Sequence, residues 1–364
     1  MGVHGSSLSA HPGAVQPPLE SRRATMRDVA ALAGVSIKTV SRVVNGEPRV
    51  SADTVARVQA AADQLNFLPD AAAASLARGS RETRTIALLI ASVGNPFSSA
   101  VFQGVEEVAS RRQVAVFAAS TEGDPATEEG LVRAFLSRSV DGLIITPTAQ
   151  DHAAISQLIG PNLPSVYVDR DPTGVEADIV TADNRSASRT ATEHLMAYGH
   201  CRIAMMADTK EISTAADRAA GYEDAFSAAG IAIAPELMVY GIGTITDAER
   251  EMERLLALPE PPTAVFASRN MAAIGTIRVL QRHGLSHQVA LIGFDDIETG
   301  DLIDPPMSVM RQDPIAIGRL AAERLFARID GDDSPPARYE VPAVLVVRGS
   351  GELAPVGVAT KAAR

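Results

Sequence analysis

The sequence predicts an α/β protein, in which a small all-α head precedes a larger body of two lobes built on doubly wound parallel sheets. Three observations lead to this fold class. Residues 25–67 carry the caps and apolar spacing of short helices. From residue 85 onward, short apolar runs alternate with helical stretches. The charge also changes sign, since residues 1–84 hold 10 Lys/Arg and 7 Asp/Glu (+3), whereas residues 85–364 hold 23 and 37 (-14).

Length and composition favour a soluble, cytoplasmic protein. The 364 residues suffice for two or three domains, each with its own core. A single cysteine, Cys201, excludes an intramolecular disulfide. Residues 1–24 contain no apolar segment and carry their basic pair at the end, the reverse of a signal peptide, so we expect a disordered tail. No apolar run approaches the roughly 20 residues that a membrane-spanning helix needs.

The head is predicted to contain three helices. The first begins after Thr25, which can form a capping box with the third residue of the helix, and it ends at Gly34. Ser36 is placed to cap the second helix after a very short connection, the tight turn of a helix-turn-helix. Ser51 can cap a third helix over residues 52–67, whose apolar spacing predicts a small core shared by all three.

One face of the second helix is polar. Lys38, Ser41, Arg42 and Asn45 stand at i, i+3, i+4 and i+7, and such side chains reach base edges and phosphates in a major groove. The weakly basic head agrees with a DNA contact without establishing it. An ordinary amphipathic helix with a solvated face is an equally good interpretation of the spacing alone.

The stretch TMRDVAALAGVSIKTVSRVVNGEPRVSADTVARVQAAADQLNFLPD resembles, nearly position by position, the DNA-binding head of the lactose-repressor (LacI/GalR) family of bacterial transcription regulators. The resemblance implies that the head binds double-stranded operator DNA through Thr25, Met26, Ser36, Ile37, Lys38, Thr39, Ser41, Arg42, Asn45 and Arg49.

The family's main specificity pair falls on Ile37 and Lys38. Lys38 can donate to guanine, while Ile37 offers only an apolar contact, for instance to a thymine methyl. Ile37 could instead belong to the core, since it shares a face with Val40 and Val44. The groove is the interpretation we favour.

Residues 69–84 form the predicted hinge and linker. The segment DAAAASLARG is too short to be a stable helix alone. The family resemblance implies a hinge helix that orders on DNA, with Leu76 wedged into the minor groove and Ala73 beside it. A plain interdomain linker is the alternative.

The body is predicted to bind a ligand at the ends of its strands. Eight apolar runs in two groups indicate two doubly wound lobes, in which ligands lie beyond the carboxyl ends of the strands. Polar residues at these ends are Asn95, Thr146, Asp169, Arg170, Arg269 and Asp295.

The same stretches resemble the effector-binding body of the family, including NPF, PSVYVDR, DRAAGY and GFDD. The resemblance implies a periplasmic-binding-protein-like body over 85–350, with one lobe at about 85–181 and 313–340 and the other at about 182–311 and 341–350. It also implies three crossover strands, near Thr181, residues 309–312 and Val341. The effector positions that it implies, suited to a sugar, are Asn95, Phe97, Ser98, Thr146, Asp169, Arg218, Arg269, Asp295 and Gln312.

Three of these positions have competing interpretations. Asp169 and Arg170 could be a structural pair at a strand end. Arg218 is favoured as a ligand contact, because Gly221 suits a helix start facing the cleft. Arg269 departs from the family, whose members often carry Asn-Asp where this chain has Arg269-Asn270, so it either turns to solvent or meets an anionic effector.

Other classes of protein fit less well. A dinucleotide-binding enzyme would need G-x-G-x-x-G after the first strand, but IASVGNPFSSAV has one glycine there. His194, His200 and Cys201 lie close in sequence, yet they resemble helix-end and core residues rather than a metal site. We expect no enzymatic activity, no cofactor and no metal.

The family resemblance thus implies a homodimeric repressor, whose two heads bind a palindromic operator and whose operator affinity is set by a small sugar-like effector between the lobes. Residues 351–364 lack a leucine heptad and are expected to be a flexible tail. A sugar-binding transport protein is the alternative, but it would need a signal peptide and no head.

Overall fold

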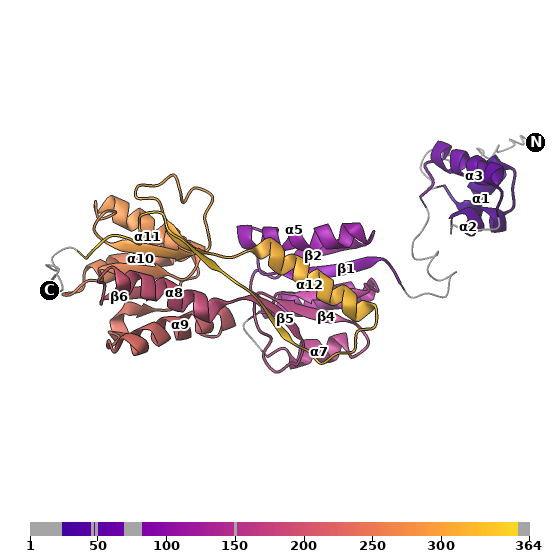
Figure 1. Ribbon diagram of the computed structural model, residues 1–364. Helices are drawn as coiled ribbons and strands as arrows, with labels where there is room; N and C mark the ends of the chain where they lie inside the picture. Colours follow the sequence, from indigo (N-terminus) through magenta and orange to yellow (C-terminus); the bar gives the residue numbers. More distant parts are fainter. Residues whose placement is uncertain (1–23, 45–46, 48–49, 69–81, 149–150, 356–364) are drawn as a thin grey trace, which may run out of the picture. The chain divides into compact units, whose positions relative to one another are not determined.

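The structure, a computed structural model, describes residues 24–44, 47, 50–68, 82–148 and 151–355. The expected N-terminal tail (1–24) and the expected hinge and linker (69–84) lie mostly outside these ranges, at 1–23 and 69–81. The expected flexible tail at 351–364 is corrected in part, because residues 351–355 are described and Leu353 packs on the core of the body. The chain divides into two compact units, a head that ends at Thr83 and a body that begins at Arg84 (Figure 1).

The head contains the three predicted helices, α1 (Met26–Ala33), α2 (Ile37–Val44) and α3 (Ala52–Gln64). All three predicted caps are confirmed. Thr25 and Asp28 form a reciprocal capping box, and Gly34 ends α1 in the left-handed conformation with φ 64°. The Ser36 hydroxyl accepts the Thr39 N–H at 3.1 Å, and the Ser51 hydroxyl accepts the backbone N–H three residues on at 3.4 Å.

A small apolar core holds the head together. Val29 of α1, Val40 of α2 and Val58 of α3 are almost fully buried against one another. Arg57 of α3 adds a hydrogen bond of 2.5 Å from Nη2 to the Ala33 carbonyl at the end of α1. Helix α3 ends three residues before the predicted boundary at residue 67, and the residues beyond it still pack on the core.

The first lobe of the body, lobe 1, is a six-stranded parallel sheet with the strand order β11-β5-β4-β3-β1-β2. Its strands are β1 (Thr85–Ile90), β2 (Ala115–Ser120), β3 (Gly142–Ile145), β4 (Ser165–Val168), β5 (Asp178–Ala182) and β11 (Arg338–Val341). Its helices are α5 (Pro96–Arg111), α6 (Pro125–Ser137), α7 (Ala153–Ile159) and α12 (Pro314–Ile329).

The second lobe, lobe 2, is a six-stranded sheet with the order β12-β10-β9-β8-β6-β7. Its strands are β6 (Ile203–Met206), β7 (Met238–Val239), β8 (Ala264–Ala267), β9 (Ala290–Phe294), β10 (Ser308–Arg311) and β12 (Val344–Val346). Its helices are α8 (Asn184–Ala197), α9 (Ser213–Ala229), α10 (Ile245–Leu256) and α11 (Asn270–Arg282), with a 3-10 turn at Pro235–Leu237. Only β12 runs antiparallel to its neighbour.

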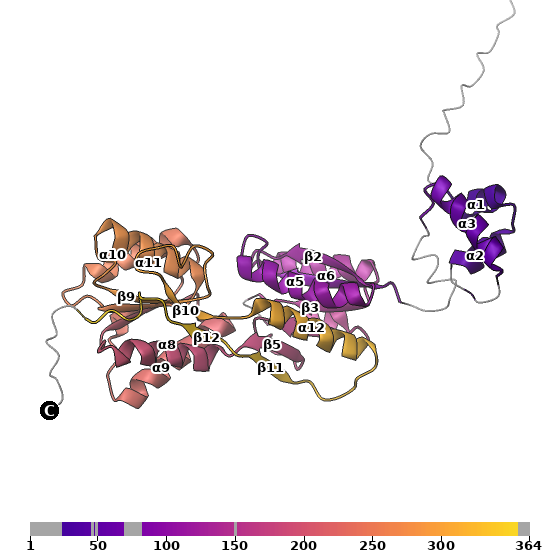
Figure 2. The same ribbon diagram turned by 45° about the horizontal axis from the view of Figure 1, so that its top comes forward.

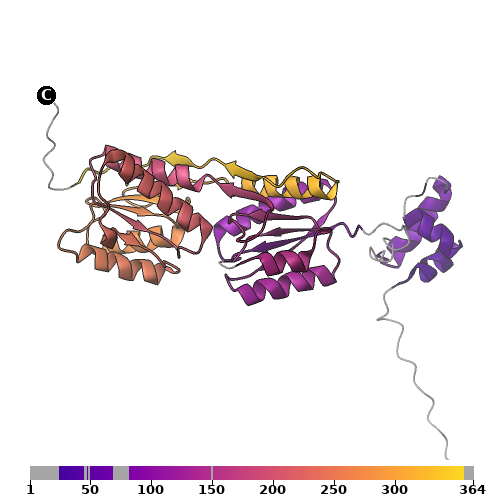
Figure 3. The same cartoon turned by 90° about the horizontal axis from the view of Figure 1, so that it is seen from below.

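Both sheets are covered on both faces, as the apolar strands predicted (Figures 2 and 3). In lobe 2, alternate strand residues pack on α10 and α11 on one face and on α8 and α9 on the other. In lobe 1, α5 and α12 cover one face, and α6 and α7 cover the other.

All eight predicted apolar runs contain strands, but one of them is not buried. Strand β2 lies at a sheet edge, and its Phe117 side chain is 43% exposed. The chain passes between the two sheets three times, after β5, after β10 and after β11 (Figure 1).

Glycines set the close contact between paired helices. A Cβ on Gly318 of α12 would lie 2.1 Å from the Val101 carbonyl oxygen of α5. On α9, a Cβ on Gly221 would lie 2.0 Å from the Arg185 carbonyl oxygen of α8. The interpretation of Gly221 as marking a helix start is therefore wrong, because it lies in the middle of α9 and permits helix packing.

Candidate functional site

Helix α2 presents the predicted DNA-facing side chains at the surface of the head. Lys38 is exposed, and Thr39 hydrogen bonds with Ser36 at the start of the helix. Ile37 is 45% exposed and lies outside the head core, so the alternative that places it in the core is wrong. The Ile37 side chain is therefore accessible in the first turn of α2.

The rest of the predicted DNA-binding set differs in how much the structure describes. Arg42 lies 3.5 Å from Glu47, with both side chains well exposed, so this ion pair is weak. Asn45, Arg49, Ala73 and Leu76 lie outside the described residues.

A polar pocket lies between the lobes, at the carboxyl ends of the strands. It is lined by Asn95, Phe97, Asp169, Arg170, Asp208, Thr214, Ala215, Arg218, Ser268, Arg269, Asn270, Asp295 and Gln312. Seven of the nine predicted effector positions therefore come together here. The remaining two, Ser98 and Thr146, are buried and do not line the pocket.

Two aspartates face the pocket from corresponding places in the two lobes. Asp169 directly follows β4 and Asp295 directly follows β9, and both have positive φ angles, 70° and 74°. Non-glycine residues are rarely held in this conformation unless the surrounding structure fixes it. Here the backbone N–H groups of Asp169 and Asp295 donate to strand carbonyls at 2.9 and 3.0 Å. The strained turns aim both carboxylates beyond the sheet ends.

Arg218 is the most constrained cation of the pocket. It lies on α9 and is 7% exposed. Its Nε donates to Asn184 Oδ1 at 2.8 Å, and its Nη1 donates to the Ser268 carbonyl at 2.7 Å. The guanidinium lies 3.7 Å from the centre of the Phe294 ring. These contacts fix the plane of the guanidinium before any ligand arrives.

Arg269 forms an ion pair with Asp208, which neither earlier interpretation anticipated. Strands β6 and β8 are neighbours with Met206 opposite Ala267, so the residues two positions beyond each strand end are side by side. Arg269 Nη1 donates to Asp208 and, at 2.9 Å, to the Ile242 carbonyl. Arg269 therefore does not turn to solvent. Asp208 was not among the predicted pocket residues, although it ends the apolar run IAMMAD and so lies at the carboxyl end of a strand like the residues that were.

The charges of the pocket influence one another. Burial raises the pKa of the Asp169 carboxyl, an effect that Arg170 and Arg218 oppose. Burial likewise lowers the pKa of the Arg218 guanidinium, and Asp295 and Asp169 are the charges that most counteract this. Gln312 donates its side-chain amide to Asp295. A wall of carboxylates, guanidinium groups and amides can both donate to and accept from ligand hydroxyl groups.

Contacts beside the pocket join the two lobes. Asn270 of lobe 2 donates to the side chain of Asn95 of lobe 1 at 3.4 Å. Across the pocket, the Asp171 N–H donates to the Ser213 hydroxyl at 2.9 Å. Both bonds join a residue of lobe 1 to a residue of lobe 2.

The residues considered for a metal site have structural partners. His194 contacts Glu352 at 2.6 Å, and His200 hydrogen bonds with the Thr263 hydroxyl and the Leu353 carbonyl at 2.8 and 2.7 Å. Cys201 is an exposed free thiol. Within the described ranges, no group of three or more His, Cys, Asp or Glu side chains is arranged to hold a metal ion. In the same ranges, no helix is long and apolar enough to span a bilayer.

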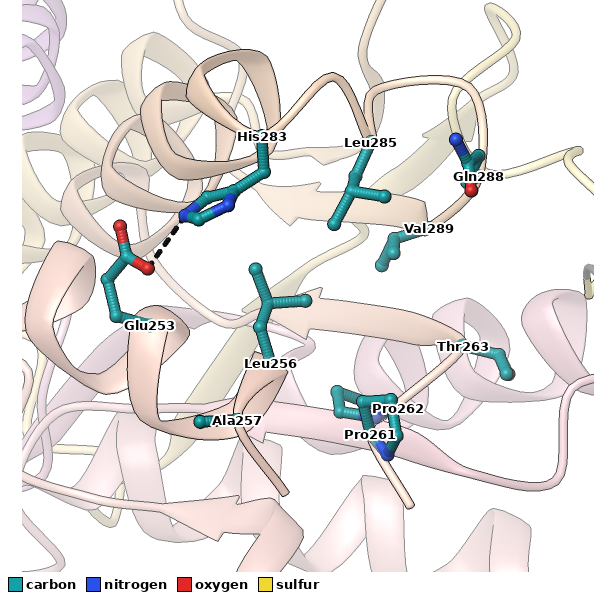
Figure 4. A pocket seen from close by; sticks show the side chains of 10 residues that line it. All are labelled: Glu253, Leu256, Ala257, Pro261, Pro262, Thr263, His283, Leu285, Gln288 and Val289. Carbon is teal, nitrogen blue, oxygen red and sulfur yellow. Dashed lines mark hydrogen bonds and ion pairs between the residues drawn. The ribbon is translucent and has the colours of Figure 1, made fainter. Parts of the chain in front are cut away.

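A second pocket lies on lobe 2 between α10 and α11 (Figure 4). His283 and Glu253 meet at one side of it, with 2.8 Å between Nε2 and Oε2. Apolar side chains such as Leu256, Leu285 and Val289 form most of the rest. A hydroxyl-rich ligand needs several convergent polar groups, so the pocket between the lobes is the better candidate.

Comparison with protein families matches both parts of the chain. Residues 25–70 match the family of bacterial regulatory proteins called the lacI family, and residues 192–351 match a periplasmic binding protein-like domain. The ribose operon repressor of Escherichia coli K12 is 34% identical over 331 residues, which cover 90% of this chain and 99% of the repressor. The transcriptional repressor PurR of Aliivibrio fischeri ES114 is 32% identical and covers 90% of this chain and 98% of its own length.

Solved structures of similar fold include complexes with small molecules. The Lac repressor dimer bound to operator and the anti-inducer ONPF has a TM-score of 0.81 and 26% identity, covering 92% of this chain and 100% of that one. The complex of the transcriptional regulator CelR with cellobiose has a TM-score of 0.68 and 31% identity, covering 90% of this chain and 100% of that one.

Proposed function

The chain belongs to the lacI family of bacterial regulatory proteins, and on that premise we propose that it is a dimeric repressor whose operator affinity is set by a small hydroxyl-rich effector between its lobes. The observation that carries the proposal is the presence, in one chain, of an exposed polar helix face in a helix-turn-helix and a polar pocket at the junction of two lobes.

Sequence recognition rests on α2. Lys38 can donate to guanine O6 or N7, and Ile37 can contact a thymine methyl, because both side chains are exposed in the first turn of the helix. Arg42, one turn further, is placed for a phosphate once its exposed contact with Glu47 opens. The core of the head, through Val40, fixes the orientation of this face.

Effector control follows from the position of the pocket. Each lobe contributes a strained aspartate, Asp169 or Asp295, so a ligand that hydrogen bonds with both favours one separation of the lobes. The ligand then shifts operator affinity by its differential affinity for the two states of closure. The same differential affinity can either strengthen or weaken operator binding, depending on which state of closure binds DNA.

An apolar groove supports assembly as a homodimer through the body. It is lined on the lobe 1 side by Phe97 and Ala100 of α5 and on the lobe 2 side by Met271, Ile274 and Ile277 of α11, among others. A second copy of the chain covering both α5 and α11 would sense any change in lobe separation, because the two helices belong to different lobes.

Because the proposed partner is operator DNA, we expect the protein in the cytoplasm. Its role is regulatory rather than catalytic. A sugar-binding transport protein is the second candidate, but residues 25–70 have no use in transport. Turnover of a bound sugar would be the sign of an enzyme, and we expect none.

Operator binding tests the proposal directly. Selection from a random DNA pool with the full chain should enrich a palindromic site. Arg42→Ala should nearly abolish binding to that site, whereas Lys38→Ala should cost about 1–3 kcal/mol at one base position in each half-site. Equal weakening by Lys38→Ala on every sequence would make Lys38 a phosphate contact, and no enrichment at all would refute the proposed function.

A further inference from the structure

The wall of the pocket between the lobes carries equal numbers of opposite charges. Its guanidinium groups are those of Arg170, Arg218 and Arg269, and its carboxylates are those of Asp169, Asp208 and Asp295. Arg170 lies 3.6 Å from Asp169, and Arg269 is paired with Asp208. Arg218 has Asp295 and Asp169 as its strongest opposite charges. Arg170 and Arg269 therefore each have a carboxylate partner, whereas Arg218 is held by Asn184 Oδ1 and the Ser268 carbonyl, with Asp295 and Asp169 as nearby charges.

The ion pair between Asp208 and Arg269 determines whether the Arg269 guanidinium is available to a ligand. Both side chains are about a quarter exposed, at 24% and 22%, so the pair borders the space that a ligand would enter. The Ile242 carbonyl accepts a second hydrogen bond from the same Nη1 of Arg269. The register of β6 on β8 sets this contact, so it does not depend on a flexible loop.

We propose that the pocket between the lobes selects an uncharged, hydroxyl-rich ring over its anionic analogues, and that Asp208 enforces this selection by occupying Arg269. A hydroxyl group donates to a carboxylate and accepts from a guanidinium without changing the net charge of the wall. An anion must displace Asp208 from Arg269 or Asp169 from Arg170, and either exchange leaves a partly buried carboxylate unpaired. The remaining cation, Arg218, already uses its Nε and Nη1 donors on Asn184 Oδ1 and the Ser268 carbonyl. This inference rests on the proposed function in one respect, namely that the effector binds in the pocket between the lobes.

Matched pairs of sugars test the selection on the full chain by isothermal titration calorimetry without DNA. The pairs are D-glucose with D-glucuronate, D-galactose with D-galacturonate, and D-ribose with D-ribose 5-phosphate. In at least one pair, the neutral member should bind the wild type about tenfold or more tightly than the anion, the size expected for a misplaced charge. Asp208→Asn should reduce that ratio by about tenfold, because it releases Arg269 for the anion.

The double variant Asp208→Asn/Arg269→Gln should again reject the anions, which separates the charge effect from a general loosening of the pocket. Asp333→Asn, an exposed aspartate in the loop after α12, serves as the matched control and should leave the ratio unchanged. Tighter binding of any anion than of its neutral partner by the wild type would overturn the inference, as would a wild type that binds no neutral member.

Inorganic phosphate gives a test that needs no knowledge of the natural effector. Phosphate should raise the melting temperature of Asp208→Asn in a saturable way, but not that of the wild type or of the double variant. Equal stabilisation of all three proteins would contradict a role for Arg269. Because no DNA is present, these results are independent of the proposed function, which would fail instead if a bound sugar left operator affinity unchanged.

Discussion

Replacing Arg218 by methionine should lower the free energy of unfolding of the body, by an amount that depends on pH. The substitution keeps an unbranched apolar stem but removes the guanidinium and its two hydrogen bonds, to Asn184 and to the Ser268 carbonyl, at 2.8 and 2.7 Å. It also removes a cation 3.7 Å from the Phe294 ring. Hydrogen bonds from a charged donor contribute about 1.5–3 kcal/mol each, and a desolvated cation–π contact contributes about 2 kcal/mol.

These gains are offset in the wild type by the cost of burying the guanidinium, which also lowers the pKa of Arg218. The net loss on substitution is therefore about 3 kcal/mol, or roughly 6–12 °C in melting temperature for a domain of this size.

The pH dependence follows from Asp169, whose pKa burial already raises. A carboxyl group whose pKa is higher in the folded state lowers stability as the pH rises from its unfolded pKa towards its folded pKa. Loss of Arg218 raises the folded pKa of Asp169 further and extends this range upward. The variant should therefore lose more stability, relative to the wild type, at pH 7.5 than at pH 5.

Urea denaturation followed by circular dichroism measures the effect in a chain that has no tryptophan. Arg138→Met, at the exposed end of α6, is the control and should change stability by less than about 0.5 kcal/mol. An Arg218→Met protein as stable as the wild type at pH 7.5, or one that is most destabilised at pH 5, would refute the reasoning.

Further predictions concern packing, buried charge and the head. Gly318→Ala should separate α5 from α12 and lower the melting temperature by several degrees in calorimetry, because its Cβ would lie 2.1 Å from the Val101 carbonyl oxygen. Asp178→Asn should cost about 3 kcal/mol in urea at pH 7, since Asp178 is 2% exposed and hydrogen bonded to Arg328 at 2.7 Å. Although burial raises the pKa of Asp178, the bonds from Arg328 and a backbone N–H lower it overall, so this cost should shrink as the pH falls below about 4. Ile37→Ala should leave the melting temperature of the head within about 2 °C and change the preferred base at one operator position, and a large stability loss would return Ile37 to the core.

Much of the fold could be predicted from local signals. The caps at Thr25, Ser36 and Ser51 confirm that short-range hydrogen bonding marks helix starts in this chain. The eight apolar runs were found because strands buried on both faces are apolar throughout. Strand β12 (Val344–Val346) was not among the eight runs although its residues are apolar, and its antiparallel pairing depends on the chain's third passage between the sheets.

The residues at the strand ends of the pocket could be predicted from the sequence, but their partners could not. Asp169, Arg269 and Asp295 were found because parallel strands bring their carboxyl ends to one edge. The partnership of Arg269 with Asp208 depends on β6 lying next to β8, a long-range contact that one sequence does not specify. Gly221 was misread for the same reason, since its role depends on α8 packing against α9.

The central claim is that one ligand between the lobes controls operator binding. Fluorescence anisotropy with the selected operator, with and without a sugar that calorimetry shows to bind, measures this coupling. The account predicts a change of about 5–150-fold in operator affinity, and the same factor in sugar affinity when operator is bound. Unchanged operator affinity with the sugar at saturation would contradict it.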